Sequence, residues 1–284
     1  MHFLQSKKHG ILGFALLLMI FLQIVGDYLI AILNISNESI RYILQALFFL
    51  IRMFLPSLFI LKFNPNIHLS AFFSKKEKPI LGFRNGIVFL CPAMLLSSGI
   101  ALILNFIGLR DTQTSSLPHT AGGMAVYILL VCFISPIVEE LFFRGIILKS
   151  LQSFGKLYAI LFSAAIFSIT HYSLYNLIYP FLVGCILAFI AFKYGIGVSI
   201  IIHIFNNFIA LISKFSVPGF QIFLLFYLII GSFVTVLMIP KIQKEVQLLF
   251  NAPKFQNAFM LCFHPVLIVF YCIALIFIIS SVSI

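Results

Sequence analysis

The chain consists of long apolar stretches separated by short polar breaks along its whole length. Stretches of about 20 apolar residues recur, which is the length that an α-helix needs to cross the hydrocarbon core of a bilayer. Because backbone amides in lipid must be satisfied within helices or closed barrels, and because the stretches are too long for barrel strands, the pattern predicts an all-α, polytopic transmembrane helical bundle of eight to nine spans. The expected spans are residues 11–33, 43–61, 86–108, 124–150, 157–174, 176–192, 196–213, 220–239 and 258–280.

Composition agrees with this class. The 284 residues are 62% hydrophobic and 9% charged, and they include 35 Phe, whereas soluble domains carry about 25% charged residues. The first apolar run, Ile11–Leu33, is too long for a signal peptide and lacks a small-residue cleavage motif, so it is expected to be retained as a span. We therefore expect a multi-pass protein of the cell membrane that forms a single membrane-embedded domain over residues 1–284.

The positions of Lys and Arg predict the orientation. With the N-terminus in the cytoplasm, thirteen of the 18 Lys and Arg residues lie on the inner side and three on the outer side, as the positive-inside rule requires. The inner set is Lys7, Lys8, Lys62, Lys75, Lys76, Lys78, Arg84, Lys149, Lys156, Lys193, Lys241, Lys244 and Lys254, and the outer set is Arg41, Arg110 and Lys214. The net charge of +11 is thus explained by topology, and the expected partner is the lipid bilayer rather than nucleic acid.

Two adjacent glutamates, Glu139 and Glu140, interrupt the fourth apolar run. A carboxylate at the centre of a transmembrane helix costs about 2.5–3.5 kcal/mol on insertion scales, and the chain has only seven acidic residues. Two carboxylates together, with Arg144 four residues later, therefore indicate a functional site. The other unusual polar groups also lie within residues 120–215, and the helices on either side are expected to serve packing.

Three pairs with i,i+4 spacing, each on one helix face, stand out in this segment. The pairs are Glu140 with Arg144, Phe167 with His171, and His203 with Asn207. Counted from the break at Gly155, Glu140 and His171 lie roughly 22–24 Å along their helices, and counted from Gly195, His203 and Asn207 lie roughly 12–18 Å along theirs. All fall within the hydrocarbon layer, so the pattern predicts a buried polar pocket formed by three helices.

The two glutamates are expected to differ in role. Glu140 faces Arg144 one turn later, and an ion pair would reduce the cost of inserting both charges. Glu139 is rotated by about 100° from Glu140 and has no partner on its own helix. It is therefore the carboxylate available as a general base.

The remaining polar groups suit amide hydrolysis by an activated water. His171 could orient the water for Glu139, and His203 and Asn207 offer N–H donors from one helix face, as an oxyanion requires. No Ser or Cys stands next to an obvious base in the sequence, so direct attack by water is the simpler mechanism.

These three motifs, EExxxR, FxxxH and HxxxN on successive helices, resemble the CPBP family of intramembrane endopeptidases, which includes CAAX-prenyl proteases and bacteriocin-processing (Abi) proteins. The resemblance covers about residues 120–215 and is carried by Glu139, Glu140, Arg144, Phe167, His171, His203 and Asn207. It implies an endopeptidase whose active site opens towards the cytosol, in which Glu139 with His171 activates water and His203 with Asn207 lines the oxyanion site. Glu140, Arg144 and Phe167 would support them, with Phe167 as a wall of the pocket.

No organic cofactor is expected, and the substrate is expected to be a peptide or membrane protein. Glu139, His171 and His203 could also form a two-His, one-carboxylate metal set. A divalent metal such as zinc therefore stays open as an alternative, although the absence of an HExxH motif and of a fourth ligand does not favour it.

Other functions remain as alternatives. A non-catalytic membrane protein that gives bacteriocin self-immunity or acts as a scaffold would bind a peptide without cleaving it. A transporter would also place charges at the midplane, but no inverted repeat is evident. The glutamates with Arg144 could equally be a structural ion-pair cluster, and His203 and Asn207 could link helices.

Three further residues in the spans bear on the pocket. Asp27 is expected to reach the interface near the outer end of the first span, and Arg52 to snorkel or to pair internally. Pro136, three residues before Glu139, is expected to free backbone carbonyls near the pocket.

Overall fold

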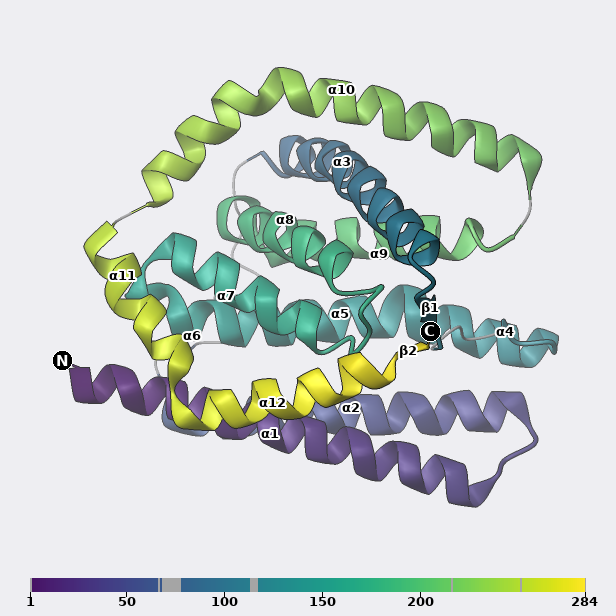
Figure 1. Ribbon diagram of the computed structural model, residues 1–284, viewed down its shortest axis with the longest axis horizontal. Coiled ribbons are helices and arrows are strands. Elements are labelled where there is room, and N and C mark those ends of the chain that lie inside the picture. The colour runs from purple at the N-terminus through teal and green to yellow at the C-terminus, as the bar shows by residue number, and fades with distance from the viewer. Residues whose placement is uncertain are drawn as a thin grey trace.

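The computed structural model describes residues 2–65, 67, 78–112, 117–215, 217–250 and 252–283, which are almost entirely helical (Figure 1). The chain begins with α1 (His2–Leu33), α2 (Glu38–Phe63) and α3 (Pro79–Phe106). A long helix follows in consecutive pieces, α4 (Ala121–Ile128), η2 (Leu129–Ile134), α5 (Ser135–Glu140), η3 (Leu141–Ile147), α6 (Leu148–Leu151) and η4 (Gln152–Phe154). The remaining helices are α7 (Lys156–Ile169), α8 (Ile178–Tyr194), α9 (Ile196–Ile212), α10 (Pro218–Leu249), α11 (Ala252–Met260), η5 (Leu261–Phe263) and α12 (Pro265–Ser280).

Several of these helices are long enough to cross a membrane, which confirms the all-α, multi-pass architecture. Among the described residues, five helices have the required length and apolarity, and a sixth span results if Lys254–Phe263 and Pro265–Ser280, bent by 62°, count as one. The predicted number of eight to nine spans is not confirmed. Helices α7, α8 and α9 have 14, 17 and 17 residues, or about 21–26 Å at 1.5 Å per residue, which is less than the ~30 Å hydrocarbon core.

The short helices lie in the interior of the bundle. Helix α8 packs against α3, α7 and α9, while α10 covers α3 on one side and α1, α2 and α12 pack together on the other. Figure 1 shows α5, α7, α8 and α9 between these two outer groups. An unbroken apolar sequence suits a helix surrounded by protein as well as one surrounded by lipid, so apolarity alone does not fix the number of spans.

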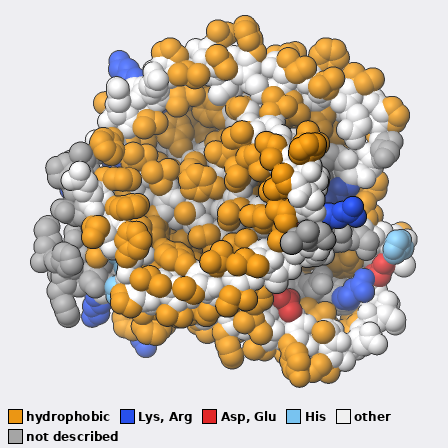
Figure 2. Space-filling view, in the orientation of Figure 1, with side chains coloured by type: hydrophobic (Ala, Val, Ile, Leu, Met, Phe, Trp, Pro, Cys, Tyr) orange, Lys and Arg blue, Asp and Glu red, His pale blue; other side chains and the backbone are white. Residues whose placement is uncertain are grey.

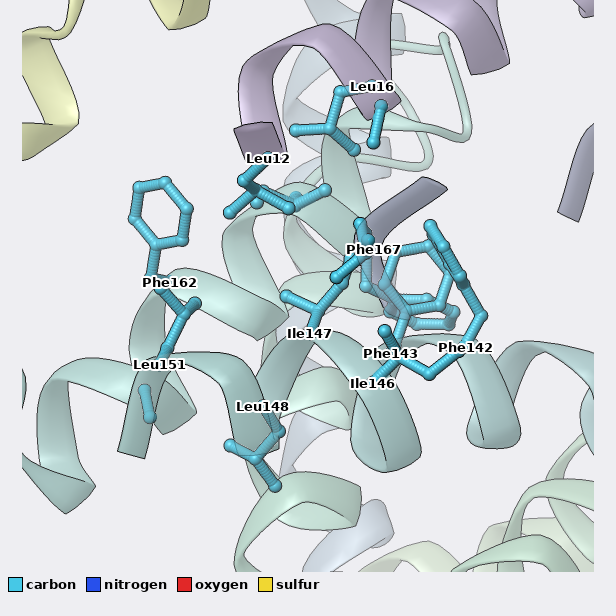
Figure 3. Close-up of a cluster of buried hydrophobic side chains, with 14 of the residues drawn as sticks. Leu12, Leu16, Phe142, Phe143, Ile146, Ile147, Leu148, Leu151, Phe162 and Phe167 are labelled. Atoms are coloured by element: carbon cyan, nitrogen blue, oxygen red, sulfur yellow. The ribbon is translucent and has the colours of Figure 1, made fainter. Parts of the chain in front are cut away.

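A large apolar core joins the centre of the long helix to its neighbours. Phe142, Phe143 and Ile147 are almost fully buried against Leu16 of α1 and Phe167 of α7, as Figure 3 shows. In lipid, close van der Waals packing of such side chains holds the helices together. The segment directly after the two glutamates is therefore fixed in place by packing.

The outer surface is also apolar, as expected for contact with lipid. Large side chains on α10 point outwards, including Phe226, Ile230, Phe233 and Leu237, which are 58–65% exposed. Figure 2 shows hydrophobic side chains over most of the visible face and only scattered charges. Apolar patches of this extent mark a membrane-facing surface in place of a water-facing one.

Two glycines form the sharp breaks that set the positions of the inner helices. Gly155 and Gly195 have φ values of +121° and +98°, a backbone conformation that glycine adopts without steric cost. Both breaks lie at the same end of the bundle as the N-terminus (Figure 1). Lys8 contacts Ser153 at this end. Lys75 and Lys76, which the sequence assigns to the same side, lie outside the described residues.

The opposite end is closed by a short antiparallel pair of strands. Strand β1 (Arg110–Asp111) follows α3 and pairs with β2 (Val282–Ser283), with Arg110 opposite Ser283. The end of the chain is thereby tied to the loop that precedes the glutamate-bearing helix.

Candidate active site

The two glutamates lie between two π-helical stretches of one continuous helix. Residues Leu129–Ile134 precede and Leu141–Ile147 follow the α-helical piece that ends in Glu139 and Glu140. A π turn widens the helix and rotates the side chains after it, and such turns occur frequently at functional sites. Here the two turns set the direction of both carboxylates.

Pro136 frees a backbone carbonyl beside the site, as predicted. The amide of Ser135 bonds to Leu130, and Pro136 has no N–H to offer, so neither can close a helical bond to the carbonyl of Val131. The side chain of Asn207 fills this gap, because its amide donates to the Val131 oxygen at 2.9 Å. The proline thus creates the acceptor that connects α9 to the glutamate-bearing helix.

Glu140 is completely buried and surrounded by polar partners. One of its oxygens lies 3.2 Å from Nη1 of Arg144 and 3.0 Å from Nδ1 of His203. The other accepts a hydrogen bond from the hydroxyl of Ser199. The predicted ion pair with Arg144 is confirmed, and the buried carboxylate also links the helix to α9.

Arg144 is likewise buried, and it connects to α7 and α8. Its Nη2 donates to the carbonyl of Gly184 at 3.3 Å, and its guanidinium lies 4.5 Å from the centre of the Phe167 ring. A Cβ at Gly184 would lie 3.0 Å from Ala164, so glycine permits the close approach of α8 to α7. Phe167 thus forms a wall of the site through a cation–π contact.

Glu139 has a different environment from its neighbour. Its side chain is 16% exposed, and its nearest charged partner is Nε2 of His203 at 3.7 Å. This distance is longer than a hydrogen bond, so the carboxylate retains room for a further partner. His203 therefore stands between the two glutamates, with one ring nitrogen directed at each.

His171 does not lie within a helix, in contrast to the prediction of a span over residues 157–174. Helix α7 ends at Ile169, and His171 occupies the turn that follows. Its Nδ1 still lies 2.9 Å from the carbonyl of Phe167, which can only accept, so Nδ1 carries the hydrogen and neutral His171 presents a free lone pair at Nε2. The ring is exposed and forms no hydrogen bond with Glu139 or His203.

Asn207 lies one turn beyond His203 on α9 and is engaged with its surroundings. Besides the bond to Val131, its oxygen accepts from the amide of Asn206 at 3.2 Å. The side-chain amide has two hydrogens, of which Val131 takes one. Within the described residues, Asn207 has no contact with the glutamates themselves.

Sequence reasoning missed Ser199, Asn206 and Tyr179. Ser199 lies four residues before His203, so the periodicity that singled out His203 and Asn207 also contains it. Asn206 accepts a hydrogen bond from Tyr179 of α8, and no spacing on one helix could have revealed a contact between two helices.

The hydroxyl of Ser199 provides a measurable part of the stability. The hydroxyl is buried, and its oxygen lies close to the Glu140 carboxylate and 3.1 Å from the Leu187 carbonyl. A hydroxyl has one hydrogen to donate, and the bond to the charged carboxylate is the stronger of the two. We expect Ser199→Ala to lower the free energy of unfolding in detergent by about 1.5–3 kcal/mol. Ser163→Ala, which removes a neutral bond to the Phe143 carbonyl, should cost about 1 kcal/mol; equal effects of the two substitutions would contradict this assignment.

A metal site would need several donor side chains close together. In the part of the chain that the structure describes, no three His, Cys, Asp or Glu side chains come together as a group that could hold a metal ion. Glu139 and His203 are neighbours, but His171 is not arranged with them as a third ligand.

Comparison with known proteins points to one family. Residues 121–209, about a third of the chain, match the family described as type II CAAX prenyl endopeptidase Rce1-like. This confirms the resemblance that the three motifs suggested, and the matched segment contains all seven motif residues. No curated protein and no solved structure matches the chain.

Proposed function

Since the segment that holds the site matches the Rce1-like endopeptidase family, we propose that this integral membrane protein hydrolyses a peptide bond of a membrane-associated or small peptide substrate. The proposal assigns general-base catalysis to Glu139 and His171, and stabilisation of the oxyanion to His203 and Asn207. Glu140, Arg144 and Phe167 hold these groups in place.

The observation that supports this proposal most strongly is the contrast between the two adjacent glutamates. Glu140 is fully buried and contacts Arg144, His203 and Ser199, whereas Glu139 is partly exposed and only approaches His203. A structural ion-pair cluster needs the first carboxylate but not the second. A carboxylate without a hydrogen-bonding partner is costly in the membrane interior, so the presence of Glu139 favours a chemical role for this residue.

Water activation follows from the donors and acceptors of these groups. Glu139 accepts a proton from water, while Nε2 of His171 accepts the second hydrogen and orients the molecule. The water oxygen attacks the carbonyl carbon of the substrate, and a tetrahedral oxyanion forms. The proton then passes from Glu139 to the leaving nitrogen as the C–N bond breaks, which yields a carboxylic acid and an amine.

His203 suits the oxyanion because its two ring nitrogens face different groups. Nδ1 lies 3.0 Å from Glu140, and Nε2 is directed towards the space beside Glu139, where an N–H donates to the oxyanion. The second amide hydrogen of Asn207 is the other donor.

The first substrate to test is a peptide of the class named by the family. A farnesylated peptide ending in a CAAX sequence, together with an unprenylated membrane peptide, should be incubated with the purified protein in proteoliposomes, and products should be identified by mass spectrometry. Replacement of His171 by Ala should slow cleavage by about 10²-fold or more. A His171→Ala protein that cleaves a confirmed substrate at the parent rate would remove His171 from the mechanism.

Asn207→Ala should lower kcat by about 10²–10³-fold, the usual effect of removing one oxyanion donor. Asn206→Ala is the neighbouring control, because it removes the same group from the next position, where the partners are Tyr179 and the oxygen of Asn207, and leaves the amide hydrogens of Asn207 in place. The assay compares both variants at saturating substrate, with folded protein recovered by size-exclusion chromatography. If the two variants lose activity equally, Asn207 links helices and does not touch the reaction.

The orientation and domain organisation belong to the same proposal. The N-terminus and the Lys-rich end of the bundle face the cytoplasm, and residues 1–284 form one membrane-embedded domain. The contact of Lys8 with Ser153, and the proximity of Lys254 to Gly155 at the same end, support this orientation.

A further inference from the structure

A second polar region lies beside the site, between α1, α2 and the first π-helical stretch. It surrounds a cavity of about 270 Å³. The polar side chains that line it are Gln23, Asp27, Gln45, Arg52 and Ser135. Such a group of polar residues is costly inside a bilayer and is not explained by the proposed catalytic groups.

Arg52 is the centre of this region. Of the two predicted alternatives, snorkelling and internal pairing, the structure shows internal pairing. The Nη1 of Arg52 donates to the side chain of Gln23, and the side-chain amide of Gln23 donates to Asp27 at 2.5 Å. Its guanidinium also lies 5.2 Å from the centre of the Phe49 ring. Its buried Nε has no hydrogen-bond partner among the described residues. A buried donor without a partner costs about 1–3 kcal/mol, unless a water molecule accepts from it.

The residues that line the cavity run from Ile30, three residues before the end of α1, to Ser135, four residues before Glu139, which does not itself line the cavity. At the outer part, the exposed Asp27 lies six residues, or about 9 Å, from the end of α1. At the inner part the cavity is lined by Val131, whose carbonyl binds Asn207, and by Ser135, one turn before Glu139. Arg52 lies about 21 Å along α2 and lines the same cavity.

We propose that this cavity holds water and delivers it to Glu139 from the end of the bundle that carries the α1–α2 turn. A polar cavity of this size has room for several water molecules, each with polar partners in reach. Hydrolysis consumes one water per bond, so the site needs a supply of water within the membrane. This inference rests on the proposed hydrolytic function, but the presence of water in the cavity can be measured without it.

The test is labelling of an introduced cysteine by a charged, membrane-impermeant methanethiosulfonate reagent added to one side of proteoliposomes. Ser135→Cys lies at the inner part of the cavity, and Gln45→Cys is a second position within it. Ser36→Cys, in the α1–α2 turn, marks the end of the bundle, and Ile24→Cys, which is 45% exposed on the other face of α1, marks the lipid surface. The parent chain gives the background from its native cysteines.

We expect Ser135→Cys and Gln45→Cys to react from the same side as Ser36→Cys, and Ile24→Cys not to react. Adding Arg52→Leu to Ser135→Cys should abolish labelling, because an apolar lining expels water from a narrow passage. Folded protein in which neither cavity cysteine reacts from that side would overturn the proposal. Labelling together with an unaffected cleavage rate in Glu139→Gln would instead reject the catalytic assignment and leave the water cavity in place.

Discussion

Replacement of Glu139 by Gln is expected to lower the rate of peptide cleavage by about 10²–10⁴-fold, the contribution of a general base. The substitution keeps the shape of the side chain but removes the negative charge that accepts a proton from water. The 3.7 Å approach to His203 is the closest ionic contact of Glu139, and a neutral side chain is less costly in the membrane interior, so the substitution should not lower the free energy of unfolding. Single-turnover cleavage in proteoliposomes and equilibrium unfolding in detergent measure the two effects.

The same variant separates catalysis from peptide binding. A protein that acts as a scaffold, or in immunity against an antimicrobial peptide, should keep its function with Gln at this position because binding does not need the base. If the protein acts by cleaving a peptide, Glu139→Gln should fail to complement cells that depend on the protein for growth. Full complementation would favour the non-catalytic alternative.

Replacement of Glu140 by Gln is expected to have the opposite profile, with a loss of stability of about 3–5 kcal/mol. The side chains of Glu140 and Arg144 are both completely buried, so the substitution leaves the guanidinium without a counter-charge. Because the two glutamates are adjacent and undergo the same chemical change, Glu139→Gln is its matched control. The measurement is the midpoint and free energy of unfolding in mixed micelles.

A double variant tests the cause of that loss. Combining Glu140→Gln with Arg144→Met removes both charges and should recover part of the stability, since no uncompensated charge stays buried. If Glu140→Gln alone unfolds like the parent, the buried ion pair does not hold the helices together. Glu140 would then need another role.

The sequence predicted the class of fold better than its details. The apolar runs are enough to specify transmembrane helices, because lipid leaves the backbone no alternative. They do not distinguish a helix surrounded by lipid from one surrounded by protein, so they do not decide whether α7, α8 and α9 cross the whole bilayer. The end of α7 at Ile169 was also hidden, since Thr170, His171 and Tyr172 continue the same mixed pattern.

Within the site, spacing along one helix was informative and contacts between helices were not. The Glu140–Arg144 ion pair follows directly from i,i+4 spacing. The position of His203 between the two glutamates depends on how α9 packs, which no local pattern reveals. The π turns on either side of the glutamates are equally invisible, because their hydrogen bonds leave no signature in residue type.

Chemical rescue tests the central role of Glu139 most directly. The measurement is the cleavage rate of a Glu139→Ala protein as a function of added formate, a small carboxylate that can occupy the vacated space. We predict almost no cleavage without formate and a rate that rises with its concentration, while Glu140→Ala shows no such response. A Glu139→Ala protein that cleaves at the parent rate without formate would contradict the assignment of this carboxylate as the base.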